Sequence, residues 1–362
     1  MRINVEMLQP GFIVRKPVFA KAIDPLIPAG VEITAQHIDF LKAFLIDTID
    51  VEAHTSKGER VQAQRIKSEP KDSSLYTQKD EISVPKNTDE RYQVAVQHYT
   101  QAFKSWQSGT AIDISSFRKV MIPLLDDALQ NPQWLARFLI SGVPCRSRAD
   151  QNITVGLLTA FLAKKMGESS GDVIQLGLIA MLADSGLSKL SPSLLDREGN
   201  FIGPEASLYE RHVSDSYNLV KNSPAFKEEI VVALTQHHEY EDGSGYPLRL
   251  TGNQINTYGK YLIACVNLVQ QMVKENKQGG IIPALDWLSF HAFKKLPKVV
   301  FKKLEMELMT LLIGASVNLS NGQKGRITFI MDECPTRPMI SLENNQVIAL
   351  SMNRSIKIVS TN

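Results

Sequence analysis

The feature that most constrains the fold is a stretch from about residue 92 to residue 276 in which apolar residues recur at helical spacing. Its clearest helical segments are residues 153–166, 173–183, 207–221, 227–238 and 261–273. Residues 285–312 continue the same periodicity. Because helices that follow one another closely bury their apolar faces against each other, this pattern predicts a helical bundle with connections of moderate length.

The two ends of the chain follow different patterns. Residues 1–52 contain short alternating apolar segments broken by turns, with Thr34 placed to cap a helix that runs to Phe44 and with a strand at residues 49–51. Residues 313–362 contain short β-prone segments separated by Asn and Gly turns. We therefore expect a small N-terminal α+β module and a short C-terminal β-rich segment, which is either a regulatory appendage or a structural cap.

Residues 53–92 are rich in Lys, Glu, Asp, Ser, Thr and Gln and poor in apolar residues. Such a segment cannot bury enough apolar surface to offset the entropy lost on ordering, so we expect a polar linker. The expected organisation is an N-terminal module at 1–52, a linker at 53–92, a helical domain at 93–312 and a β-rich appendage at 313–362. The fold class is then mainly α.

Bulk composition narrows the choice of partners and compartment. The net charge of +2 over 362 residues creates no global field that would attract nucleic acid, so we expect no DNA or RNA partner. The 3 cysteines are far apart and form no CxxC pair, which favours a reducing cytoplasm. The N-terminus does not read as a signal peptide, and no segment reaches the roughly 18 apolar residues of a transmembrane helix.

The most specific motif is the string His-His-Glu-Tyr-Glu-Asp-Gly-Ser-Gly-Tyr-Pro at residues 237–247. The chain has 7 histidines in all, so an adjacent pair followed by carboxylates is unusual. Neutral imidazole is the commonest protein ligand for metals, and its charge changes near physiological pH. The pair therefore indicates a metal or acid–base site. The alternative is a polar helix end that runs into an Asp-Gly turn.

This string resembles the signature of the HD-GYP family and matches each of its fixed positions: His237, His238, Glu239, Asp242, Gly243, Gly245, Tyr246 and Pro247. The resemblance extends to the order of helical segments in residues 147–276. It implies an HD-type helical bundle in a bacterial, metal-dependent phosphodiesterase that opens cyclic di-GMP. Members use two or three metal ions, often iron or manganese, bridged by an aspartate. Adjacent ions suit this reaction because they activate water and neutralise phosphate charge.

Other positions of the family pattern are only partly kept in this chain. Asp184 matches the bridging aspartate, and His212 matches a lone histidine. The replaced positions are Gln151 and Ala183 for two histidines, Leu187 for a lysine, Asn267 for the final aspartate, and Ser147 for a glutamate of three-metal members. Alanine cannot coordinate a metal, and the amides of Asn and Gln are weak ligands for these ions.

The replacements fall on one of the two metal positions that the resemblance implies. The kept ligands would surround one ion: Asp184, His212, His237 and His238. The replaced residues belong to the other position: Gln151, Ala183 and Asn267. We therefore expect one divalent ion, iron or manganese rather than zinc, on the four kept residues, which would also be the catalytic ones. The expected function is cyclic di-GMP signalling, with weak or no phosphodiesterase activity and a binding or regulatory role.

Two other functions stay open from the sequence. The chain could be an active phosphodiesterase that hydrolyses cyclic di-GMP or a related dinucleotide with one metal or with ligands from elsewhere. It could also be a metal-free interaction module in which Asp184 and the histidines are hydrogen-bonded relics. In that case residues 242–247 would form a contact loop for a protein partner.

Overall fold

The computed structural model describes residues 2–18, 27–35, 37, 38, 41, 48–55, 85, 87–195, 197, 201–275 and 280–361 of the 362-residue chain. The chain divides into two compact units, Met1–Ser83 and Val84–Asn362. Within the described residues, no helix has the length and apolar character needed to span a membrane.

The N-terminal unit contains one pair of strands and a short helical segment. Strand β1 (Arg2–Asn4) pairs antiparallel with β2 (Thr48–Asp50). The backbone N–H of His37 donates to the Thr34 hydroxyl at 3.2 Å, so Thr34 caps a helical segment as expected. The expected end of that helix at Phe44 lies outside the described residues.

The helical unit begins inside the segment 53–92 that we expected to be a linker. Helix α2 starts at Thr88 because the side chain of Asn87 accepts the backbone N–H of Glu90 at 2.9 Å and caps the first turn. This end of the expected linker is therefore helical. Most of the remainder, residues 56–84, lies outside the described part of the chain.

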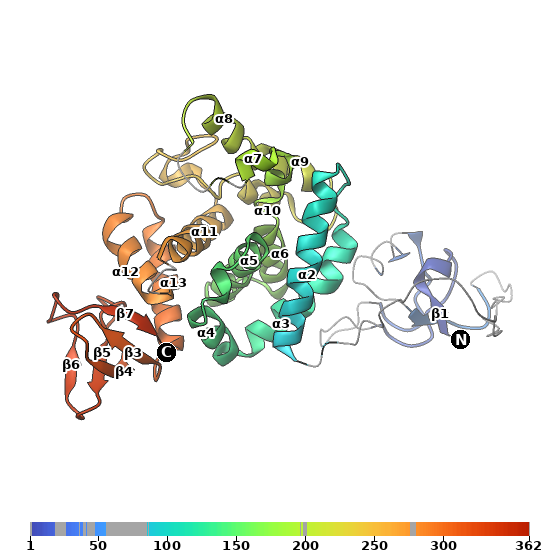
Figure 1. Ribbon diagram of the computed structural model, residues 1–362. Coiled ribbons are helices and arrows are strands. Elements are labelled where there is room, and N and C mark those ends of the chain that lie inside the picture. The colour runs from blue at the N-terminus through green and yellow to red at the C-terminus, as the bar shows by residue number, and fades with distance from the viewer. Residues whose placement is uncertain are drawn as a thin grey trace, which may run out of the picture. The chain divides into compact units, whose positions relative to one another are not determined.

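The helical unit has the mainly α fold expected from the sequence, with its helices packed around a central pair (Figure 1). Its helices are α2 (Thr88–Gln107), α3 (Ile114–Gln130), α4 (Pro132–Ile140), α5 (Arg148–Lys165), α6 (Ser170–Met181), α7 (Pro192–Leu195), α8 (Pro204–Glu210), α9 (His212–Val220), α10 (Glu228–Leu234), α11 (Thr257–Glu275), α12 (Ile281–His291) and α13 (Lys298–Leu311). Two helices are shorter than expected. Residues 207–221 divide at Arg211 between α8 and α9, and α10 ends at Leu234, before the histidine pair.

A histidine ring bonds to the backbone at both breaks. Tyr209 and Leu234 each offer their backbone carbonyl to the Nδ1 atom of a histidine three residues later, His212 and His237, at 2.6 Å. A continuing α-helix would use each carbonyl for the backbone N–H four residues later. The histidine side chains therefore help to end these helices, a local competition that helical periodicity does not reveal.

Helices α5 and α6 form the centre of the unit and set the geometry of the site. Both are buried on nearly all sides, as expected for helices inside a core. They cross closely at Gly156, where a Cβ atom would lie 2.6 Å from the carbonyl oxygen of Gly177. After α6 the chain turns into the 3-10 segment η3 (Ser185–Lys189). Asp184 lies at this turn, beside the first turn of α5.

The C-terminal segment is an antiparallel sheet with the strand order β6-β5-β4-β3-β7. Its strands are β3 (Ser316–Leu319), β4 (Lys324–Phe329), β5 (Met339–Leu342), β6 (Val347–Ala349) and β7 (Ile358–Thr361). The sheet shares one hydrophobic core with the helices, and β7 lies beside α12 (Figure 1). The guanidinium of Arg337 donates to the Asp286 carboxylate of α12 through Nε and Nη2, both at 3.1 Å. The β-rich segment therefore packs against the helices within one compact unit, Val84–Asn362.

Candidate metal centre

Four side chains from separate parts of the helical unit converge on one point. Asp184 lies between α6 and η3, His212 is the first residue of α9, and His237 and His238 follow α10. One ligand atom from each lies within 4.8 Å of the others, an arrangement that could hold a metal ion. The structure thus brings together the four residues predicted as metal ligands.

The close approach of η3 to α9 depends on Gly186. A Cβ atom there would lie 2.1 Å from the carbonyl oxygen of His212 and 2.6 Å from the backbone nitrogen of Ser216. The N–H of Gly186 donates to the Ser216 hydroxyl at 2.7 Å. This backbone contact places Asp184, two residues earlier, against His212.

Hydrogen bonds set the orientation of two imidazole rings. The Nδ1 atoms of His212 and His237 donate to backbone carbonyl oxygens, which turns the Nε2 atom of each ring toward Asp184. The Nε2 atoms of His212, His237 and His238 are buried and have no hydrogen-bond partner among the described residues. Buried polar atoms are rarely left without a partner, whereas a bound metal would satisfy all three. Three imidazoles and one carboxylate fit a divalent transition-metal ion.

Asp184 is the acidic member of this cluster. Its Oδ1 atom lies 3.4 Å from Nε2 of His212 and 3.5 Å from Nε2 of His237. Burial alone would raise the pKa of this carboxyl, but its contacts with the two imidazoles hold the pKa well below the usual range. The carboxylate is therefore ionised at neutral pH and faces the point where a metal would supply positive charge.

His238 is prepared for metal binding in a different way. Burial, reinforced by the neighbouring rings of His237 and His212, holds the pKa of His238 well below its usual range. Its ring stacks on Tyr246 with centroids 4.7 Å apart and an interplanar angle of 28°. The imidazole is therefore neutral at neutral pH, which is the form that binds a metal.

The other signature residues shape the loop that follows the histidine pair. Glu239 is buried, and its carboxylate oxygens accept the backbone N–H groups of Leu248 and Leu250 at 2.6 and 2.9 Å. Asp242 accepts the N–H two residues later at 3.0 Å. A Cβ atom on Gly245 would lie 2.5 Å from Cα of Glu239, so this close approach requires glycine. The turn is completed by Gly243, with φ of 75°, and by Pro247. These residues hold His238 and Tyr246 in place and do not belong to the four-residue cluster.

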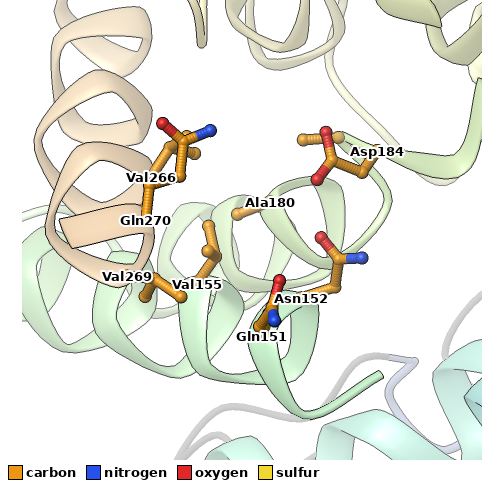
Figure 2. Close-up of a pocket in the computed structure, with 9 residues that line it drawn as sticks. Gln151, Asn152, Val155, Ala180, Asp184, Val266, Val269 and Gln270 are labelled. Atoms are coloured by element: carbon orange, nitrogen blue, oxygen red, sulfur yellow. The ribbon is translucent and has the colours of Figure 1, made fainter. Parts of the chain in front are cut away.

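A cavity of about 30 Å³ also adjoins Asp184, and none of the three histidines of the cluster lines it. Figure 2 shows the residues that line it, which come from α5, the end of α6 and α11: Gln151, Asn152, Val155, Ala180, Ala183, Asp184, Val266, Val269 and Gln270. Gln151 and Ala183, two of the predicted replacements, thus lie beside Asp184. The cavity walls are amides and apolar groups, and Asp184 is the charged residue among them.

The third predicted replacement, Asn267, is directed elsewhere. Its Nδ2 atom donates to the Ile263 carbonyl at 2.8 Å, and its Oδ1 atom accepts the Tyr240 hydroxyl at 3.2 Å. Val266, the preceding residue of α11, lines the cavity instead. Successive residues of a helix point about 100° apart. Placing the family position one residue too late in the sequence therefore assigned it to a different face of α11. One sequence signal could have identified Val266: it lies three residues before Val269, so the two share a helix face, and both line the cavity.

The two other replaced positions are occupied by a buried apolar residue, Leu187, and by a helix cap, Ser147. Leu187 is buried within η3, and its apolar side chain supplies no charge to the site. Ser147 caps α5, because its hydroxyl accepts the backbone N–H of Asp150 at 3.2 Å. Sequence reasoning also missed Asn152, which lies in the first turns of α5 beside Gln151 and lines the cavity.

Sequence and structure comparisons relate the helical unit to known proteins. Residues 119–285 match the HD domain family. The chain is 23% identical over 163 residues to a cyclic di-GMP phosphodiesterase of Pseudomonas aeruginosa, a match that covers 45% of this chain and 39% of that protein. It is 29% identical over 164 residues to a cyclic di-GMP phosphodiesterase of Thermotoga maritima, which covers 42% of this chain and 44% of that protein. A solved HDG"Y"P protein from Bdellovibrio bacteriovorus aligns over 84% of this chain and 97% of that chain, with a TM-score of 0.43 and 13% identity. The chain thus spans less than half the length of these two curated relatives.

Proposed function

The helical unit belongs to the HD-GYP family of HD domains, and on this premise we propose that the chain is a cyclic di-GMP signalling protein with a single metal centre. The centre would hold one divalent ion, iron or manganese rather than zinc, on Asp184, His212, His237 and His238. The protein would bind a cyclic dinucleotide or regulate a partner, and it would hydrolyse the ligand weakly or not at all.

One observation carries this proposal: the groups on the two sides of Asp184 differ. On one side, three imidazole Nε2 atoms lack hydrogen-bond partners among the described residues. On the other side are amides, Ala183 and Val266. Alanine and valine cannot coordinate a metal, and neutral amides bind these ions weakly. These groups favour one ion and disfavour a second.

The loss of a second ion would weaken hydrolysis. Two ions about 4 Å apart can stabilise both the attacking and the leaving oxygen of a phosphodiester. Removing one well-placed electrostatic stabiliser typically costs about 10²–10³ in rate. The remaining ion would supply Lewis acidity and an anchor for a phosphate oxygen. The chain itself would hold the imidazoles through the carbonyls of Tyr209 and Leu234 and would shield His238 with Tyr246.

The dinucleotide ligand is proposed from the relatives and from aromatic groups beside the centre. Both curated relatives are cyclic di-GMP phosphodiesterases. In this chain Phe201 and Tyr209 stack with centroids 4.8 Å apart and an interplanar angle of 21°. The Tyr209 ring in turn lies 5.1 Å from the ring of His212. Aromatic surface next to a metal suits a ligand that carries both nucleobases and phosphates.

The test uses one sample of the whole chain, prepared with excess iron or manganese under reducing conditions. Metal content is measured by mass spectrometry, cyclic di-GMP binding by calorimetry, and turnover by chromatography of the products. We expect about one ion per chain, measurable binding, and turnover at least about 10²-fold below that of a two-metal relative assayed in parallel.

His237→Ala removes a ligand, and His291→Ala is its matched control. His291 is exposed and stacks on Trp287 at 4.7 Å, outside the four-residue cluster. We expect the first variant to lose the metal and the second to keep it. Turnover that equals the relative's and disappears in His237→Ala would identify an active phosphodiesterase instead. A chain without stoichiometric metal would favour the interaction module.

A further inference from the structure

Large apolar side chains remain exposed where α12 ends and α13 begins, a region that we call the α12–α13 corner (residues 287–302; Figure 1). Trp287 and Phe290 of α12 are 40% and 66% exposed. Phe293, in the connection, is 57% exposed, and Val299 of α13 is 79% exposed. An exposed apolar group of this size marks a surface that contacts something outside the unit.

The same corner is basic. Residues 287–304 contain five lysines and no Asp or Glu. The fifth, Lys303, pairs with Glu307 at 2.8 Å. The other four are exposed and form no ion pair among the described residues: Lys294, Lys295, Lys298 and Lys302. Because the whole chain has a net charge of only +2, this positive charge is local to the corner.

The aromatic rings and the cations of the corner lie side by side. The Nζ atom of Lys298 is 4.1 Å from the centroid of the Phe293 ring. The ring of His291 stacks on Trp287 with centroids 4.7 Å apart and an interplanar angle of 16°. Cations over aromatic faces stabilise such rings in an exposed position. The corner is therefore one mixed surface of rings and amines.

The corner also adjoins the loop that carries the histidine pair. The carbonyl oxygen of Lys295 accepts the backbone N–H of Glu241 at 2.8 Å. The Lys295 ammonium lies 5.0 Å from the centroid of the Tyr240 ring. Both partners belong to the string 237–247, so a surface that holds the corner would also lie beside this loop.

Composition and charge select an anionic lipid surface as the occupant. Protein interfaces are enriched in Arg and depleted in Lys, whereas the four free cations of the corner are all lysines. At a bilayer, lysines need no matched partner, because the potential of many anionic headgroups attracts them together. Trp and Phe beside lysines are typical of surfaces that enter the headgroup region.

We infer that the α12–α13 corner docks on a membrane surface that contains anionic phospholipids. Its lysines face the headgroups, while Trp287, Phe293 and Val299 enter the interface between headgroups and acyl chains. This docking goes beyond the proposed function and requires neither a bound metal nor a nucleotide.

Sedimentation with vesicles tests the docking on the whole chain. One set of vesicles contains phosphatidylglycerol and phosphatidylcholine in equal amounts, and the other contains phosphatidylcholine alone. Because salt screens exposed charges, we expect binding to the anionic vesicles to weaken at least about 10-fold between roughly 0.1 M and 0.5 M salt. Equal binding to both sets, or no binding to the anionic set, would overturn the inference.

Tryptophan fluorescence identifies the face that docks. Trp106 and Trp134 are buried, so acrylamide quenches mainly Trp287. Anionic vesicles should protect this residue from quenching and shift its emission to shorter wavelength. Unchanged quenching in the vesicle-bound chain would show that another face binds. Self-association that protects Trp287 without vesicles would assign the corner to a second copy of the chain instead.

Paired lysine variants separate local from general charge. A lysine near an anionic surface contributes about 5-fold in affinity, so Lys298→Gln with Lys302→Gln should weaken vesicle binding about 20-fold. The matched control is Lys104→Gln with Lys119→Gln, which removes the same charge from exposed positions on α2 and α3. We expect the control to bind nearly as the parent chain does. An equal loss in both pairs would refute the assignment to this corner.

Discussion

The triple substitution Gln151→His, Ala183→His and Val266→Asp should convert the proposed one-metal centre into a two-metal centre. All three residues line the cavity beside Asp184. Aspartate is smaller than valine, so the change at Val266 introduces charge without overpacking the core. Metal analysis after gel filtration should give one ion per chain in the parent and two in the variant.

The expected gain follows from the charges at this place. Two divalent ions about 4 Å apart repel each other by roughly 17 kcal/mol at an effective dielectric constant of about 20. A carboxylate about 4 Å away attracts the second ion by about 8 kcal/mol, which offsets only about half of that repulsion. Asp184 is the one carboxylate among the residues that line the cavity, so in the parent chain a second ion gains nothing. The added carboxylate contributes about 8 kcal/mol more, and the two added imidazoles supply donor atoms.

The same variant should be destabilised when metal is absent. Val266 is 6% exposed, and an unpaired carboxylate in such a place costs on the order of 3–5 kcal/mol. At about 2 °C per kcal/mol for a unit of this size, the melting temperature should fall by about 6–10 °C. Excess manganese should restore it, because the ions pair the buried charge.

The control places the carboxylate one residue later, through Asn267→Asp in place of Val266→Asp. Asn267 contacts Ile263 and Tyr240 rather than the cavity, so this version should hold one ion and should not be rescued by manganese. Two ions in the control, or one ion in both variants when folded, would refute the assignment of Val266 to the cavity face of α11.

Acid should destabilise the metal-free protein through His238. Burial lowers the pKa of this imidazole in the folded state, so the unfolded chain binds the proton at a higher pH than the folded chain does. The free energy of unfolding should therefore fall by up to about 1.4 kcal/mol per pH unit below about pH 6.5. Denaturant titrations at about pH 7.5 and 5.5 measure this slope, and a His238→Gln variant with an unchanged slope would contradict the assignment. Gly186→Ala places a methyl group 2.1 Å from the carbonyl oxygen of His212, so the free energy of unfolding should drop by about 3 kcal/mol and metal affinity should also fall. A stable variant with normal metal affinity would show that this close contact is not needed. Arg337→Leu leaves the Asp286 carboxylate without its two hydrogen bonds from the guanidinium and should lower the free energy of unfolding by about 2 kcal/mol. The metal content should stay at one ion. A variant as stable as the parent chain would mean that core packing alone holds the sheet.

Helices α5 and α6 were predictable because the predominantly apolar runs at residues 153–163 and 173–183 are longer than typical strands. Their close crossing at Gly156 was not predictable, because it depends on which faces meet in three dimensions. The sequence also did not predict that helices end at Glu210 and Leu234, where histidine rings bond to backbone carbonyls. Periodicity reports which faces are apolar and does not report such local competition.

The residues of the candidate site also divide into those that the sequence identified and those that it did not. His237 and His238 lie in one contiguous motif, so their identity as a pair needed no fold. Val266 and Asn267 are adjacent in a helix without a fixed motif residue beside them, and only the orientation of α11 decides which one faces Asp184.

The backbone carbonyls that hold His212 and His237 belong to helix ends, so the imidazoles are oriented before any ion arrives. A centre of this kind can load and release metal without refolding, and the rate of exchange is set by access and by the water shell of the incoming ion. Affinity for imidazole and carboxylate donors rises through the first-row divalent series toward copper, so such a rigid centre does not by itself choose manganese or iron. Any ion bound there would be decided by the supply in its surroundings, and a change in that supply would replace the ion while leaving the fold intact.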